Sequence, residues 1–159
     1  MRVSIFSSAF TGYLASKLPC HPYYVTWTRE HVIPKSIIGN RQITEDPRNI
    51  LPFPKQLNHA RSNLSYTSQW KDGRTFQACT KCPNPDFCRG TMNVGKAGVH
   101  PPDVFKGPIA RSVLYSVGKY PRLANTIADQ VLDLDTAILW DSYYPMSPAE
   151  RDWLDSLKI

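Results

Sequence analysis

The sequence lacks any apolar run long enough to cross a bilayer as a helix, which takes about 20 residues. This excludes a membrane-spanning segment, and we expect no membrane partner. Residues 1–19 also lack the long apolar stretch at the centre of a secretory signal. We therefore expect an intracellular setting, with an organelle or a virus-encoded origin as open alternatives.

Glycine is scarce as well, with eight glycines against fourteen prolines in 159 residues. This balance predicts an irregular, loop-rich first two-thirds. No internal repeat or low-complexity tract is visible. The length and the 42% hydrophobic content fit one domain, residues 1–159, with a substantial core.

Acidic residues are few until late in the chain. Residues 1–122 contain 17 Lys and Arg against 6 Asp and Glu, a net charge of +11, whereas residues 123–159 contain 2 against 7, a net charge of −5. A basic body of this kind suits a polyanion such as nucleic acid. Because many basic proteins bind no nucleic acid, charge alone leaves the question open.

The first half of the chain predicts a strand region and one helix. Tyr23–Trp27 is β-branched and aromatic, which is typical of a strand, and residues 29–33 continue it or form its partner. The segment 36–48 is predicted to be a loop. Pro54 can begin a helix over about 55–63, because its missing N–H needs no partner there.

The last third changes character. Apolar residues recur at helical spacing from Ile109 onward, and this pattern includes Ile138 and Leu139. Ser147 and Glu150 form a capping box before a final helix. We expect a helical scaffold over about 105–158 with little chemistry of its own.

Three residues from two segments carry the chemistry of interest. Glu30 and His31 are adjacent, and Asn58 lies on the predicted helix. A carboxylate and an amide oxygen suit Mg²⁺, and an imidazole suits a base that takes a proton from water. Neighbours on a regular strand point to opposite faces, so Glu30 and His31 can share a site only at a strand end or a bulge. On its own, such a pair is usually solvated surface.

Three longer sequence runs make a functional role for the Glu30-His31 pair more credible. The runs REHVIPKS, DPRNILPFPKQLNHARSN and PPDVFKGPIARSVLYSVGKY follow one another along the chain. In order, spacing and content, residues from about Trp27 to Trp140 resemble the endonuclease I family of ββα-metal (His-Me finger) nucleases. The resemblance implies an α+β fold whose ββα-metal core spans about 23–64. It also implies cleavage of DNA, and often RNA, without sequence preference, to 5′-phosphate ends.

The family's site residues fall on matching positions here. By resemblance, Glu30 and Asn58 would hold one Mg²⁺, and His31 would be the general base. The family also uses an arginine at the scissile phosphate, for which Arg41, Arg48 and Arg61 are candidates. We favour Arg61, one helical turn from Asn58, with a helix-surface salt bridge as its alternative role.

The chain also departs from the family pattern. Arg48 stands where relatives usually carry His, and Phe53 stands at a usually polar position. These departures bear on efficiency and substrate grip. The other histidines, His21, His59 and His100, are expected to be structural or on the surface.

Four cysteines lie at Cys20, Cys79, Cys82 and Cys88, the last three in the segment 65–104, which is predicted to be irregular. They could form a structural zinc site, remain free thiols or form disulfides. We favour zinc, because a CxxC followed by a third cysteine resembles half of a structural zinc site.

The sequence thus predicts a Mg²⁺-dependent endonuclease with DNA, and RNA as a further substrate, bound through the phosphate backbone. The main alternative is an inactive nucleic-acid-binding or structural subunit on the same fold. A site-specific HNH-type enzyme would need a recognition module, for which one domain leaves little room. The oligomeric state does not follow from the sequence.

Overall fold

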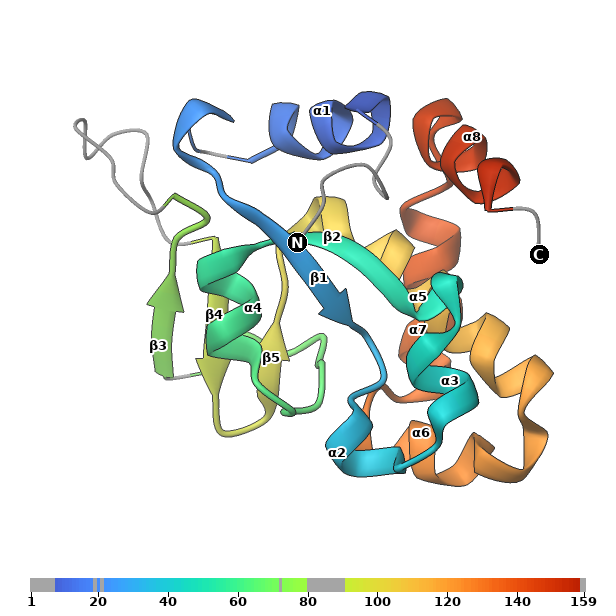
Figure 1. Ribbon diagram of the computed structural model, residues 1–159. Coiled ribbons are helices and arrows are strands. Elements are labelled where there is room, and N and C mark those ends of the chain that lie inside the picture. Colours follow the sequence, from blue (N-terminus) through green and yellow to red (C-terminus); the bar gives the residue numbers. More distant parts are fainter. Residues whose placement is uncertain (1–7, 19, 21, 72, 80–90, 158–159) are drawn as a thin grey trace.

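The computed structural model describes residues 8–18, 20, 22–71, 73–79 and 91–157 (Figure 1). At its centre lies a two-stranded antiparallel sheet of β1 (Trp27–His31) and β2 (Ile50–Pro54). Glu30 pairs with Leu51 and His31 with Ile50, in a register without a bulge. The helix α4 (Lys55–Arg61) follows β2 directly and packs against both strands.

Local chemistry explains this order of two strands and a helix. Pro54 ends the strand and occupies the N-cap of α4, and the predicted helix is confirmed, although it ends at Arg61. Past the end of β1, the buried Asn49 accepts a hydrogen bond from the N–H of Ile33 (2.8 Å) and donates one to its carbonyl (3.1 Å). Asn49 therefore holds the two strand ends together beside His31. The strand predicted over Tyr23–Trp27 begins only at Trp27, because Pro22–Tyr24 form a 3₁₀ turn, η2.

The connection between the strands is not the loop that the sequence predicts. It contains α2 (Lys35–Ile38), α3 (Arg41–Glu45) and the 3₁₀ turn η3 (Pro47–Asn49). Gly39, with φ of 64°, separates the two helices in a conformation that favours glycine. Asn40 caps α3 by accepting from the Ile43 N–H, and Asp46 caps η3 in the same way. Caps stabilise these short helices, which are too short to show a periodic pattern.

A second sheet replaces much of the predicted irregular segment. It has the order β3 (Gly73–Phe76), β4 (Met92–Gly95) and β5 (Gly98–His100), all antiparallel. The helix α4 lies between this sheet and the central pair of strands (Figure 1). Between α4 and β3, Tyr66 forms an isolated β-bridge with Val99.

The predicted helical third is confirmed over the described residues. It contains α5 (Asp103–Lys119), the 3₁₀ turn η5 (Pro121–Leu123), α6 (Ala124–Gln130), α7 (Leu134–Tyr143) and α8 (Pro148–Ser156). The buried residues Phe105, Ile109 and Val113 line α5. The first helix, α1 (Ser8–Ser16), joins this layer through Phe10, whose ring stacks on that of Trp153 at 5.0 Å.

Two details of this third differ from the sequence analysis. Ile138 and Leu139 are 58% and 57% exposed, because α7 turns Ala137 and Trp140 to the core instead. The predicted cap is present, with the Glu150 N–H donating to Ser147 Oγ at 3.1 Å. The Glu150 side chain does not complete the capping box, since it binds Arg111.

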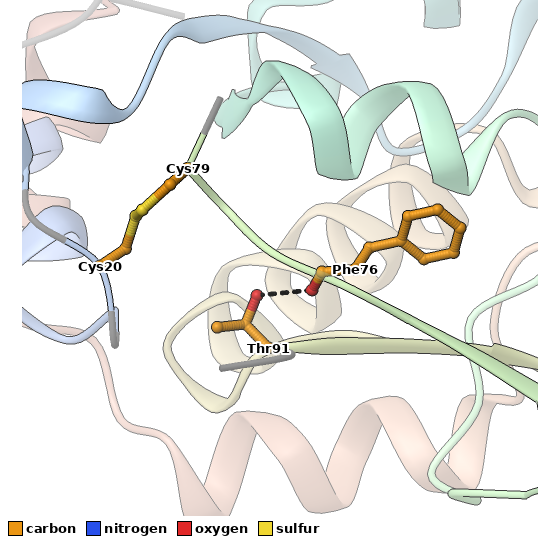
Figure 2. The surroundings of a disulfide bond; sticks show 4 residues. All are labelled: Cys20, Phe76, Cys79 and Thr91. Atoms are coloured by element: carbon orange, nitrogen blue, oxygen red, sulfur yellow. Dashed lines mark hydrogen bonds between the residues drawn. A yellow bond between two sulfur atoms is a disulfide. The ribbon is translucent and has the colours of Figure 1, made fainter. Parts of the chain in front are cut away.

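The structure joins Cys20 and Cys79 in a disulfide (Figure 2). This corrects the expected four-cysteine zinc site, because a sulfur bonded to another sulfur is no thiolate ligand. Cys82 and Cys88 lie outside the described residues. Nearby, the Thr91 hydroxyl donates to the Phe76 carbonyl where β3 meets β4 (Figure 2).

Of the helices in the described ranges, none has the length and apolar character that crossing a bilayer requires.

Candidate functional site

The carboxylate of Glu30 is almost enclosed, with 2% of the residue exposed. Its Oε1 accepts a hydrogen bond from Arg61 Nη1 at 3.2 Å, and its Oε2 accepts one from the Tyr66 hydroxyl at 2.8 Å. Burial is the largest influence on this group and raises its pKa to about 7, although Arg61 and Tyr66 act in the opposite direction. Glu30 is therefore a carboxylate whose negative charge costs free energy in this site.

Arg61 is completely buried and does not lie on the helix surface. Besides Glu30, its guanidinium donates to the carbonyls of His31, Val32 and Leu64 at 2.7 to 3.0 Å. The guanidinium also lies over the Tyr66 ring, 4.2 Å from its centre. A group with so many protein partners is not available to a phosphate. The expected phosphate contact of Arg61 is therefore wrong, and so is its alternative as a surface salt bridge.

His31 is the last residue of β1, which meets the strand-end condition from the sequence. Its side chain is half-buried, and burial lowers the pKa of the imidazole. A hydrogen bond with the backbone of Thr44, in the connection between the strands, opposes that effect. A lowered pKa keeps the ring neutral near pH 7, the form that accepts a proton.

Asn58 faces β1 from the helix α4. Its Nδ2 donates to Thr28 Oγ1 at 3.0 Å and to the Arg29 carbonyl at 2.9 Å. With both amide hydrogens used by β1, the side chain is oriented, and no donor in the described part of the chain binds its Oδ1. That oxygen is the one that a metal ion would need.

The geometry brings two of the three residues to the same face of β1. Thr28 and Glu30 alternate with Arg29 and His31 along the strand, and the first two contact α4 through Asn58 and Arg61. Because Asn58 and Arg61 are three positions apart, they lie one turn apart on the helix. Glu30 and Asn58 therefore share the α4 side, while His31 lies at the strand end with Thr44 as its neighbour.

The donor chemistry of this face suits a hard divalent cation. The carboxylate of Glu30 and the free amide oxygen of Asn58 are oxygen ligands of the kind Mg²⁺ takes, and each Glu30 oxygen keeps a lone pair after its hydrogen bond. A nearby cation would also offset the cost of charge on Glu30. Among the described residues, no group of three or more His, Cys, Asp and Glu side chains gathers around one point. A bound ion would therefore keep several waters.

A shallow hollow of about 420 Å³ opens beside Asn58. Lys55 and His59 line it from α4, together with Thr28 and Ser62. From the sequence, His59 was expected to be structural or on the surface, and its place beside Asn58 in this hollow was not predicted. Two basic side chains one turn apart make this hollow suitable for a phosphate group.

Arg48 occupies a second basic position near His31. It lies two residues before Ile50, which pairs with His31, and its guanidinium stacks on the Tyr115 ring at 4.4 Å. Within the described ranges, its guanidinium has no carboxylate partner, whereas Arg41 is paired with Glu45. Of the three arginines considered from the sequence, Arg48 is therefore the one with free donors.

Asp46 fixes the turn that carries Arg48. Its Oδ1 accepts from the Arg48 N–H, and its Oδ2 accepts from Tyr115, Lys119 and Tyr120 at 3.0 to 3.1 Å. Burial raises the pKa of the Asp46 carboxyl, but these hydrogen bonds outweigh it and hold the pKa below its ordinary value. The turn η3 is thus anchored to the end of α5 by an ionised carboxylate.

The chain matches a known protein family. A family model described as Endonuclease I matches residues 5–156, which is nearly the whole chain. The match includes β1, β2 and α4, which carry Glu30, His31 and Asn58.

Proposed function

Since the chain belongs to the endonuclease I family and is therefore a nuclease, we propose that it is a Mg²⁺-dependent endonuclease. It would hydrolyse phosphodiester bonds in DNA, and in RNA as a second substrate, with little sequence preference and 5′-phosphate products. The observation that carries this proposal is that two oxygen-bearing side chains, Glu30 and Asn58, are oriented on one face of β1 with His31 at the strand end.

In this proposal each residue of the site has one task. Glu30 and Asn58 hold the ion, which when bound neutralises charge on the phosphate and on the departing oxygen. His31 accepts the proton of the attacking water, and its neutral form is favoured by partial burial. Arg61 and Tyr66 are positioning residues, because they contact Glu30 and not the substrate.

Substrate contacts come from the basic side chains around this face. Arg48 has free donors beside the strand end, so it is the better candidate for the scissile phosphate. Lys55 and His59 line the hollow beside Asn58 and would bind a neighbouring phosphate. Such contacts carry no base readout, which agrees with low sequence preference.

The test is digestion of supercoiled plasmid by the wild type and by His31→Ala. We expect nicking in Mg²⁺, none in EDTA, and a loss of at least about 10²-fold in rate for His31→Ala. His59→Ala is the matched control on the neighbouring helix. It should weaken substrate binding but keep the maximal rate within a few-fold of wild type. Equal rates for the wild type and His31→Ala would refute the proposed base.

A second function remains to be separated from the first, because Glu30 is enclosed and both its oxygens have protein partners. If that arrangement is purely structural, the protein would bind nucleic acid without cutting it. The same plasmid assay decides between the two. An inert wild type that still shifts DNA in a gel, in Mg²⁺ and in EDTA alike, would favour the binding protein.

A further inference from the structure

Trp70 is a large aromatic side chain that is not buried in the core. It is 53% exposed and lies beside β5, with its ring 5.3 Å from that of His100 in an edge-on arrangement at 67°. Both rings line a hollow of about 280 Å³, together with Lys17 and Asp103 among others. This volume is at the small end of ligand sites and suits one ring system.

The neighbouring groups make this more than a scattered surface tryptophan. Burial is the main reason that the pKa of His100 is lowered, and the charge of Lys106 adds to it, so the imidazole stays neutral near pH 7. Among the described residues, its Nδ1 has no hydrogen-bond partner although it is buried. An unpaired buried nitrogen is rare in native structures, because it costs free energy. Since this nitrogen is enclosed, what the hollow offers a ligand is the neutral ring of His100 beside Trp70.

A short segment of the chain leads from the candidate site to this hollow. The segment before Trp70 runs beside β5, with the Val99 N–H donating to the Ser65 carbonyl and the Thr67 N–H to the Val99 carbonyl, both at 2.8 Å. Within that segment, Tyr66 binds Glu30. Trp70 lies four positions after Tyr66, so their Cα atoms are at most about 14 Å apart. A nucleic-acid strand bound at the candidate site beside Glu30 can therefore reach Trp70 within a few nucleotides.

We propose that Trp70 and His100 form a subsite for one unpaired nucleobase, stacked on Trp70, with Lys17 near its phosphate. This inference rests on the proposed function only in taking nucleic acid as the ligand. Every base has a face that can stack on an aromatic ring, so the subsite needs no particular sequence. A paired base inside a duplex cannot enter it without leaving the stack, so the subsite favours single strands.

The experiment measures binding of a labelled single-stranded oligonucleotide, and of the matching duplex, by fluorescence anisotropy in EDTA. Trp70→Ala should weaken single-strand binding by roughly 5- to 100-fold, the range for loss of one stacked base. Trp70→Phe should restore most of the affinity, and duplex binding should change less than twofold. Tyr143→Ala, which removes another exposed ring (77% exposed), is the matched control and should leave both affinities unchanged.

A Trp70→Ala protein with a wild-type circular dichroism spectrum and wild-type single-strand affinity would overturn the proposal. So would equal losses of single-strand and duplex binding. The outcome is independent of hydrolysis, because EDTA is present throughout. A protein that binds through Trp70 but never cuts plasmid would sink the proposed nuclease mechanism and leave the base subsite standing.

Discussion

Arg61 shows how a side chain can serve a site without touching the substrate. Four hydrogen bonds and the Tyr66 ring hold its guanidinium against the carboxylate of Glu30. A buried ion pair of this kind adds little net stability, but removing one partner leaves an uncompensated charge. Arg61 therefore fixes the orientation of the Glu30 carboxylate, and for the same reason its guanidinium is not free to bind a phosphate.

Arg48, unlike Arg61, has donors free to contact a phosphate. We expect Arg48→Ala to lower kcat/KM on plasmid by about 10²-fold, because a donor to developing phosphate charge is lost. Arg48→Lys should recover only part of the rate, since lysine lacks the planar fork of donors. Arg41→Ala is the control, because Arg41 is exposed and paired with Glu45, and its rate should stay within twofold of wild type. Wild-type cleavage by folded Arg48→Ala would remove Arg48 from the site.

At the scale of single elements, the turn η3 depends on the charge of Asp46. Its pKa is lower in the folded protein than in the unfolded chain, so the ionised form stabilises the fold. This contribution is fully present above the ordinary pKa of 3.8 and disappears as the pH falls through the lower, folded-state value. Asp46→Asn should therefore cost about 2 kcal/mol of unfolding free energy at pH 7.

Urea denaturation at several pH values checks this prediction. The difference between wild type and Asp46→Asn should shrink as the solution becomes more acidic than pH 3.8. Glu45→Gln changes an exposed neighbouring carboxylate and should cost less than about 1 kcal/mol at any pH. A constant difference across the acid range would mean that the Asp46 charge is not what anchors η3.

Elements differed in how well the sequence predicts them. The helices of the last third follow from apolar spacing, and α4 follows from Pro54 and the residues after it. The short helices α2 and α3 were missed because single caps stabilise them and no period can develop in four or five residues. The sheet β3-β4-β5 was missed because its strands have only three or four residues each, too few for a clear alternating pattern, and because β3 pairs with β4 across a long separation in sequence.

The candidate site shows the same division. Glu30, His31 and Asn58 could be named from three ordered motifs, and Glu30 and Asn58 do lie on one face. The burial of Arg61 could not be foreseen, because its ring partner, Tyr66, comes from a segment with no periodic pattern. Their roles in catalysis, and the Mg²⁺ ion, stay predictions.

At the scale of the whole molecule, the disulfide ties the segment after α1 to the segment after β3. The two cysteines are 59 residues apart, and closing a loop of that length removes entropy from the unfolded chain worth about 4 kcal/mol. The double variant Cys20→Ala with Cys79→Ala should lose free energy of unfolding up to this amount, measured in denaturant without reductant. Persistent disulfides are typical of oxidising compartments, which stands against the expected intracellular setting.

Alkylation provides the control for that prediction. In native wild-type protein treated without reductant, peptides containing Cys20 and Cys79 should carry no alkyl group, and both should be labelled after reduction. Labelling of either cysteine before reduction would contradict the bond. Ser16→Ala, a change on the exposed end of α1, should leave the free energy of unfolding within about 0.5 kcal/mol of wild type.

The position of α4 between two sheets limits where insertions and deletions can be tolerated during evolution. One residue inserted before Asn58 would rotate every later side chain of the helix by about 100° and carry Asn58 and Arg61 away from Thr28 and Glu30 together. The stretch from Lys35 to Gly39 is less constrained, because it is mostly exposed and Asn49 closes the strand ends whatever the length of chain between them. Relatives should therefore vary freely in the number of residues there, while the count from Pro54 to Arg61 stays the same.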